Sequence, residues 1–215
     1  MSTPSEVPIV DLPGSREIIS RTERVSGAKW TMVTDRVRLD ADTQVDRDLV
    51  VHPGAVGIVA LDNEERVTLI RQYRHPVAAE LWEIPAGLLD EPGEPPWLTA
   101  QRELLEEVGL QAREWHTILD LYSSAGMSSE TVRIFLARGL SVVDPANRPV
   151  PTDEERDLVV RAVPLAGAVE QVMSGAVHNS LAIAAILAAS EARRRGWQTL
   201  LPADHTWPGP SWGTL

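Results

Sequence analysis

Three glutamates and one arginine lie close together in the middle of this 215-residue chain, in the segment RELLEE from Arg102 to Glu107. On a helix, residues three and four positions apart share a face, so Glu103 has both Glu106 and Glu107 as neighbours. Like charges at this spacing repel each other, and a cation can relieve the repulsion. Hard divalent cations prefer oxygen ligands, and two of them can bridge a phosphate and activate a water for attack.

Arg102 is the only basic residue among these glutamates, and its guanidinium can hold carboxylates in place through paired hydrogen bonds. The alternative is that the acidic run is an ordinary solvated face of a helix. The charges alone favour that simpler interpretation, so the choice depends on the residues around the segment.

A helix from about residue 96 to 108 is expected to carry these side chains. Pro95 and Pro96 suit a helix start, where a missing N–H costs nothing, and Gly109 suits the end. The spacing of Leu98, Leu105 and Val108, broadened by Leu104, predicts an apolar stripe that faces the core. The glutamates are then expected mainly on the other side. Glu94 lies just before the proline pair and could reach the same face as the glutamates.

Strands are predicted on both sides of this helix. Residues 17–25 and 29–39 read as a hairpin, and residues 41–48 as an acidic loop before a short strand at 48–51. Further strands are expected at 55–61, 66–73, 81–85, 115–123, 131–137 and 157–163, and helices at 165–173 and 178–194. The order predicts an α+β protein with a small N-terminal β-rich region.

The composition excludes several classes of function. The net charge of −11 argues against a nucleic-acid-binding protein, which needs a basic face. The chain has no cysteine, so disulfides, zinc–thiolate sites and a cysteine nucleophile are excluded. Neither a secretory signal nor an apolar segment long enough to span a bilayer is visible, so we expect a cytoplasmic protein that does not bind membranes.

The segment from Gly87 to Leu110 resembles the Nudix box, GX5EX7REUXEEXGU, in which U is an apolar residue. Seven residues separate Glu94 from Arg102, and RELLEEVGL matches every specified position. Six residues rather than five separate Gly87 from Glu94. One extra residue in a Gly/Pro-rich loop costs little and leaves the helical residues in register.

The resemblance extends, over roughly residues 16 to 195, to the ADP-ribose pyrophosphatase branch of this family, through the segments RQYRHP, IPAGLLD and HNSLAIAAILA. It implies a Nudix fold, in which a mixed β-sheet core lies in an α/β/α sandwich. It also implies hydrolysis of ADP-ribose to AMP and ribose 5-phosphate with Mg²⁺ or Mn²⁺, two or more ions per site. The implied assembly is a homodimer that exchanges N-terminal strands and binds its small nucleoside diphosphate substrate across the interface.

The resemblance also implies roles for individual residues. Glu103 and Glu107 are expected to be the main metal ligands, with the carbonyl of Ala86 and with Glu94 and Glu106 as additional or water-mediated ligands. Arg102 is expected to orient the glutamates. The general base is expected in the acidic loop TDEERDL, at Glu155, with Glu154 as the reserve; a merely solvated loop is the alternative.

Three further residues are candidates for substrate binding. Arg71 and Arg74 are expected to contact the diphosphate or a ribose, although both could be ordinary surface arginines. Glu130 matches a position that contacts the terminal ribose in relatives.

Two alternatives remain open for the function. The chain could hydrolyse another nucleoside diphosphate sugar, or it could be a catalytically silent nucleotide sensor, which the intact glutamates disfavour. The expected organisation is a dimerisation region at 1–50, a Nudix hydrolase domain at 51–195 and a Trp-rich tail at 196–215.

Overall fold

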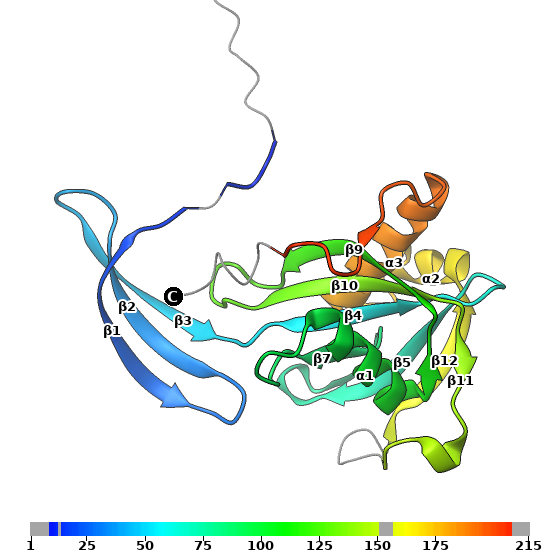
Figure 1. The fold of residues 1–215 in the computed structure, drawn as a ribbon. Helices are drawn as coiled ribbons and strands as arrows, with labels where there is room; N and C mark the ends of the chain where they lie inside the picture. Colours follow the sequence, from blue (N-terminus) through cyan, green and yellow to red (C-terminus); the bar gives the residue numbers. More distant parts are fainter. Residues whose placement is uncertain (1–8, 13, 151–156, 208–215) are drawn as a thin grey trace, which may run out of the picture.

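The computed structural model describes residues 9–12, 14–150 and 157–207. Its strands and helices, shown in Figure 1, are β1 (Glu17–Ser26), β2 (Thr31–Arg38), β3 (Gln44–Val51), β4 (Ala55–Ala60), β5 (Arg66–Arg74), β6 (Ala79–Glu83), β7 (Ala86–Leu88), α1 (Pro96–Val108), β8 (Leu110–Gln111), β9 (Glu114–Tyr122), β10 (Thr131–Arg138), β11 (Ser141–Val142), β12 (Val159–Pro164), α2 (Leu165–Met173), α3 (Ser180–Arg194) and β13 (Leu201–Pro202). Within the described ranges, no helix has both the length and the apolar character that a membrane crossing requires.

A five-stranded sheet, in the order β13-β9-β10-β4-β7, forms the centre of the molecule. Only the pair β4 and β10 is parallel, so the sheet is mixed. All six residues of β4 are buried, and their side chains alternate between two helical layers. Val56 and Ile58 pack in one cluster with Leu104 of α1, whereas Val59 packs in another with Ile186 of α3. The expected α/β/α sandwich is therefore confirmed.

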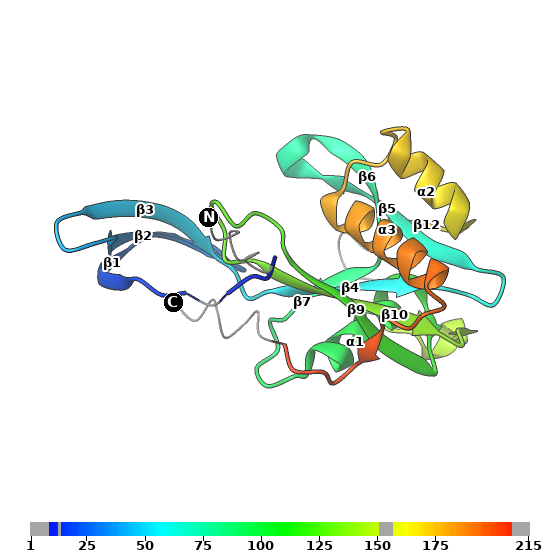
Figure 2. The ribbon, with the colours of Figure 1, turned by 90° about the horizontal axis from the view of Figure 1, so that it is seen from above.

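A second sheet, β12-β5-β6, is antiparallel throughout and lies beside α2 and α3 (Figure 2). Its strand β6 leads within two residues into β7, which belongs to the central sheet. The residues from Glu83 to Leu88 therefore connect the two sheets directly in front of α1. This connection places β5 and β6 next to the acidic helix.

The N-terminal strands β1, β2 and β3 form a separate antiparallel sheet that projects from the body (Figures 1 and 2). An ion pair and backbone hydrogen bonds attach it: Lys29 Nζ lies 2.5 Å from a carboxylate oxygen of Asp90, the N–H of Val50 donates to the carbonyl of Met127, and the N–H of Ser129 donates to the carbonyl of Val50. Every residue of β1 is exposed. Strand β1 pairs with β2 along one edge, while its side chains remain open to solvent.

The expectation of an acidic loop at residues 41–48 was wrong from residue 44 onward, where the strand predicted at 48–51 already begins. Strand β3 begins at Gln44 and pairs with β2 over eight residues. Its aspartates face basic and hydroxyl groups of the neighbouring strand: Arg36 Nε donates to Asp46 at 2.8 Å, and Thr34 Oγ1 to Asp48 at 2.6 Å. Opposite charges on neighbouring strands thus offset the low β-propensity of aspartate.

The helix α1 was predicted at the correct residues, but its buried face was not. Its fully buried residues are Thr99, Ala100 and Leu104, while Leu98 is exposed. Glu103 and Glu107 each follow a core position, Ala100 and Leu104, by three residues. They therefore lie beside the buried stripe rather than opposite to it. This rotation brings both carboxylates against the β6–β7 connection.

Candidate active site

Gly87 allows the acidic helix to approach strand β7 closely. A Cβ atom at residue 87 would collide with the side chain of Glu103. The close approach therefore depends on the missing side chain, which is one of the uses of glycine. The carboxylate of Glu103 is only 13% exposed and lies directly against the strand backbone.

Glu107 is a largely buried carboxylate at the end of the helix that contacts strand β7. The backbone N–H of Ala86 donates to its Oε2 at 2.9 Å. Burial raises the pKa of Glu107 to about 8, and the negative charges of Glu103 and Glu83 act in the same direction. The N–H of Ala86 and the charge of Arg74 lower it, but they do not outweigh burial. A carboxylate in such a place is stabilised in its charged form by a nearby cation.

The guanidinium of Arg102 forms hydrogen bonds with three other glutamates of the site. Its Nη1 donates to Glu103 at 2.7 Å and to Glu106 at 3.0 Å, and its Nη2 donates to Glu94 at 3.2 Å. Burial opposes the charged form of Arg102, but the hydrogen bond to Glu94 and the charges of Glu103 and Glu106 raise its pKa above the ordinary value. The hydrogen bond from Arg102 also lowers the pKa of Glu94. The arginine thus favours the ionised form of Glu94 and holds the three carboxylates beside one another.

The donor set fits a hard divalent cation. All the candidate ligands are oxygen atoms, which Mg²⁺ and Mn²⁺ prefer. They are the backbone carbonyl of Ala86 and the carboxylates of Glu94, Glu103, Glu106 and Glu107. Among the described residues, no three acidic or histidine side chains converge as a finished metal site. Glu94, Glu103 and Glu106 instead each contact the guanidinium of Arg102. Glu107 remains separate and is held by Ala86.

An arginine and a buried glutamate extend the site onto the second sheet. Arg74 Nε and Nη2 donate to the two carboxylate oxygens of Glu83 at 2.8 and 2.6 Å. Glu83 is only 3% exposed and also accepts a hydrogen bond from Gln72 Nε2 at 3.3 Å. Sequence reasoning missed Glu83 and Gln72. The available signal was a glutamate between apolar residues, in the segment LWEI, where an unpaired charge is rarely buried.

The structure does not bring every expected residue to this cluster. Arg71 lies on the opposite face of β5 from Arg74, where its Nε is 3.0 Å from a carboxylate oxygen of Glu80. Glu130 lies just before β10, hydrogen-bonded to Ser123 and 3.8 Å from His52 Nε2. The proposed base residues Glu154 and Glu155 lie outside the described residues.

Comparisons with known proteins agree with this geometry. A family model described as NUDIX domain matches residues 51–179. A protein of Mycobacterium tuberculosis named ADP-ribose pyrophosphatase is 44% identical over 191 residues, which cover 89% of this chain and 90% of the relative. A protein of Bacillus subtilis with the same name is 35% identical, over 75% of this chain and 85% of the relative.

A solved structure supports the fold independently. It is described as an ADP compounds hydrolase and superposes with a TM-score of 0.72 at 21% sequence identity. The superposition covers 87% of this chain and 99% of the other. At this identity the match shows a shared architecture, which includes the residues that lie N-terminal to the family match.

Proposed function

This chain belongs to the NUDIX domain family, and we propose that it hydrolyses the diphosphate bond of ADP-ribose to give AMP and ribose 5-phosphate. The observation that carries the proposal is the set of carboxylates around Gly87 and Ala86, in a chain whose long matches are to proteins named ADP-ribose pyrophosphatase. The geometry supports the reaction type, and the relatives support the substrate.

The acidic helix is the proposed binding site for Mg²⁺ or Mn²⁺, two or more ions per site. Glu103 and Glu107 are the main ligands in this proposal, and the carbonyl of Ala86, Glu94 and Glu106 are additional or water-mediated ligands. Such ions neutralise the diphosphate and activate a water when they are bound. Arg102 holds Glu94, Glu103 and Glu106 within reach of one another, so it is a positioning residue.

Side chains of this protein are proposed to accept a proton and to bind the substrate. The oxygen of a water bonds to one phosphorus while the bridging oxygen leaves with the other phosphate. Glu155, or Glu154 in its place, accepts the proton of that water as the general base. Arg74, whose guanidinium donates to Glu83, is proposed to contact the diphosphate. Glu130 is proposed to contact the terminal ribose.

We propose a homodimer as the working assembly. The support is the exposure of all ten residues of β1, including Ile18, Ile19 and Val25. A second copy that packs on the N-terminal sheet would bury these side chains, and burial of apolar surface favours association. Such a dimer would also place N-terminal residues of one copy near the substrate of the other. A cytoplasmic location, which the absence of cysteine suits, is part of the same proposal.

A substrate panel tests the proposal. Purified protein is incubated with ADP-ribose and with other nucleoside diphosphate sugars, with either Mg²⁺ or Mn²⁺, and the products are separated by chromatography. We expect AMP and ribose 5-phosphate from ADP-ribose, at the highest kcat/KM of the panel. A higher kcat/KM for another sugar would reassign the substrate. Absence of turnover with every compound would support the silent sensor instead.

A further inference from the structure

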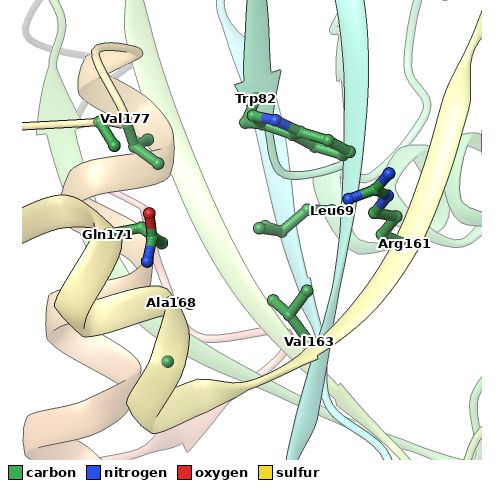
Figure 3. A pocket seen from close by; sticks show the side chains of 9 residues that line it. Leu69, Trp82, Arg161, Val163, Ala168, Gln171 and Val177 are labelled. Atoms are coloured by element: carbon green, nitrogen blue, oxygen red, sulfur yellow. The ribbon is translucent and has the colours of Figure 1, made fainter.

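A cavity of about 310 Å³ lies between α2 and the sheet β12-β5-β6 (Figure 3). Its walls are mostly apolar, and they include Leu69 of β5, Val163 of β12, Ala168 of α2 and Val177. In Figure 3, Gln171 points from α2 toward the same space. Cavities of at least about 300 Å³ with apolar walls and few polar groups are typical of sites for small molecules.

The rim of this cavity carries an aromatic ring between cationic groups. The guanidinium carbons of Arg161 and Arg71 lie 5.5 and 5.6 Å from the ring centroid of Trp82. Arg71 is neutralised by Glu80. Arg161 is exposed, and within the described part of the chain no carboxylate pairs with it. The guanidinium of Arg161 therefore places a positive charge at the opening of the apolar cavity.

This cavity is separate from the carboxylate cluster. Successive residues of a strand point to opposite faces of the sheet. On β6, Trp82 faces the cavity, whereas Glu83 points to the other face and binds Arg74. On β5, Leu69 lines the cavity, while Gln72 reaches Glu83. The same two strands thus form two different sites on their two faces.

We propose that the cavity binds a small organic anion, with an aromatic or branched apolar body and one carboxylate, sulfonate or phosphate group. The apolar body is buried against Leu69, Val163, Ala168 and Val177. The anionic group lies at Arg161, and Gln171 offers an amide for a further hydrogen bond. A charge-assisted bond from a guanidinium is among the stronger polar contacts in proteins, so the group at Arg161 orients the ligand.

The test uses 8-anilinonaphthalene-1-sulfonate, an aromatic sulfonate, in a fluorescence titration of the whole protein. We expect saturable binding to one site per chain. Gly167→Leu fills the cavity, because a Cβ atom at this position on α2 meets nothing within 4 Å and leucine favours a helix more than glycine. Arg161→Gln removes the charge. Each variant should raise the Kd of the probe by about tenfold or more.

Matched controls isolate the cavity from general effects. Ala166→Leu adds a leucine at an exposed position of the same helix, and Arg138→Gln removes a guanidinium from another tryptophan, Trp197. Both should bind the probe like wild type, with unchanged near-ultraviolet circular dichroism. Equal Kd values in Gly167→Leu and wild type would overturn the proposal. So would a native protein that does not bind the probe, whether or not a second copy covers this face.

Discussion

Burial distinguishes Glu107 from the other carboxylates of α1. Its pKa of about 8 lies above the ordinary value of 4.5, because the surrounding protein excludes water. Glu94, by contrast, has a lowered pKa because Arg102 donates a hydrogen bond to it. The pKa values of two glutamates within one site thus shift in opposite directions: the hydrogen bond from Arg102 lowers that of Glu94, while burial raises that of Glu107 despite the nearby charge of Arg74.

The raised pKa has a consequence for stability without metal. In the unfolded chain Glu107 releases its proton near pH 4.5, whereas the folded protein holds it up to about pH 8. The free energy of unfolding should therefore fall as pH rises from about 5 to 8, by at most about 1.4 kcal/mol per pH unit. Urea denaturation in EDTA measures this change.

Glu107→Gln should remove most of this pH dependence, because the amide oxygen still accepts from Ala86 and carries no charge. Glu106→Gln is the control: its carboxylate is more exposed and already contacts Arg102. The explanation fails if Glu107→Gln shows the same decline between pH 5 and 8 as wild type.

Gly87→Ala tests the close contact between β7 and α1. The added Cβ atom meets the carboxylate of Glu103, so either the side chain or the helix must move. A displaced ligand should lower kcat for ADP-ribose by about ten- to a hundredfold, since small misplacements in an active site are costly. Gly126→Ala is the matched control, because its Cβ atom meets nothing within 4 Å. Wild-type kcat in Gly87→Ala would show that the contact is dispensable.

At the level of elements, the sequence predicted most of the central body. The limits of α1 were correct because proline and glycine mark its ends, and β4 was recognisable as a continuous apolar run. Only the end of β3, residues 48–51, was predicted, because the aspartates before it have low β-propensity, and the ion pair with Arg36 that stabilises this part depends on pairing with β2. Local sequence carries no information on such a partner.

In the candidate site, too, local sequence identified some residues, while others depend on how the strands pair. The Nudix box identified the glutamates of α1, Glu94 and Arg102 through spacing alone, and the structure brings Arg102 into contact with Glu94 and with two glutamates of the helix. Glu83 was not identified, because its role arises from the pairing of β5 with β6, which places it beside Arg74. The rotation of α1 that puts Glu103 beside the core was also missed, since Leu98 and Leu105 suggested a different stripe.

The N-terminal cap of α3 contributes to the stability of the fold, and this contribution can be measured. The side chain of Asn179 accepts a hydrogen bond from the N–H of Ala182 at 2.8 Å and caps the helix. Because α3 packs on β4 and β9 in the main core, its cap should matter for the whole fold. Asn179→Ala should lower the free energy of unfolding by about 1 kcal/mol, as judged by chemical denaturation.

Ser180→Ala, at the neighbouring exposed position, is the control and should change the free energy of unfolding by less than about 0.5 kcal/mol. If both substitutions changed the free energy of unfolding equally, the capping bond of Asn179 would not stabilise the fold.

For the whole molecule, the N-terminal sheet and the C-terminal segment show different degrees of attachment. The C-terminal segment is fixed to the body, because the buried Arg133 donates to the carbonyl of Thr206 at 3.4 Å and lies over Trp207. The N-terminal sheet instead projects, with few contacts to the body and with β1 fully exposed (Figure 1). This contrast supports the proposed dimer.

Sedimentation equilibrium tests the dimer. The wild-type protein should show twice the chain mass of 23.6 kDa. Val25→Asp places a charge on β1, where Val25 is 54% exposed, and should shift the mass toward the monomer. Val142→Asp, at an exposed valine outside this sheet, should leave the mass unchanged. A monomeric wild-type protein would contradict the proposed dimer. A dimeric Val25→Asp variant would show that the exposed side of β1 around Val25 is not the dimer interface.

The carboxylates of α1 are proposed to hold the divalent metal that hydrolysis requires, and Mn²⁺ binding measured by electron paramagnetic resonance is a direct test. Loss of free Mn²⁺ signal on titration with protein reports binding without any need for turnover. We expect wild-type protein to bind Mn²⁺ and the double variant Glu103→Gln/Glu107→Gln to lose that binding while keeping its circular dichroism spectrum. Equal Mn²⁺ binding by the two proteins would contradict the claim.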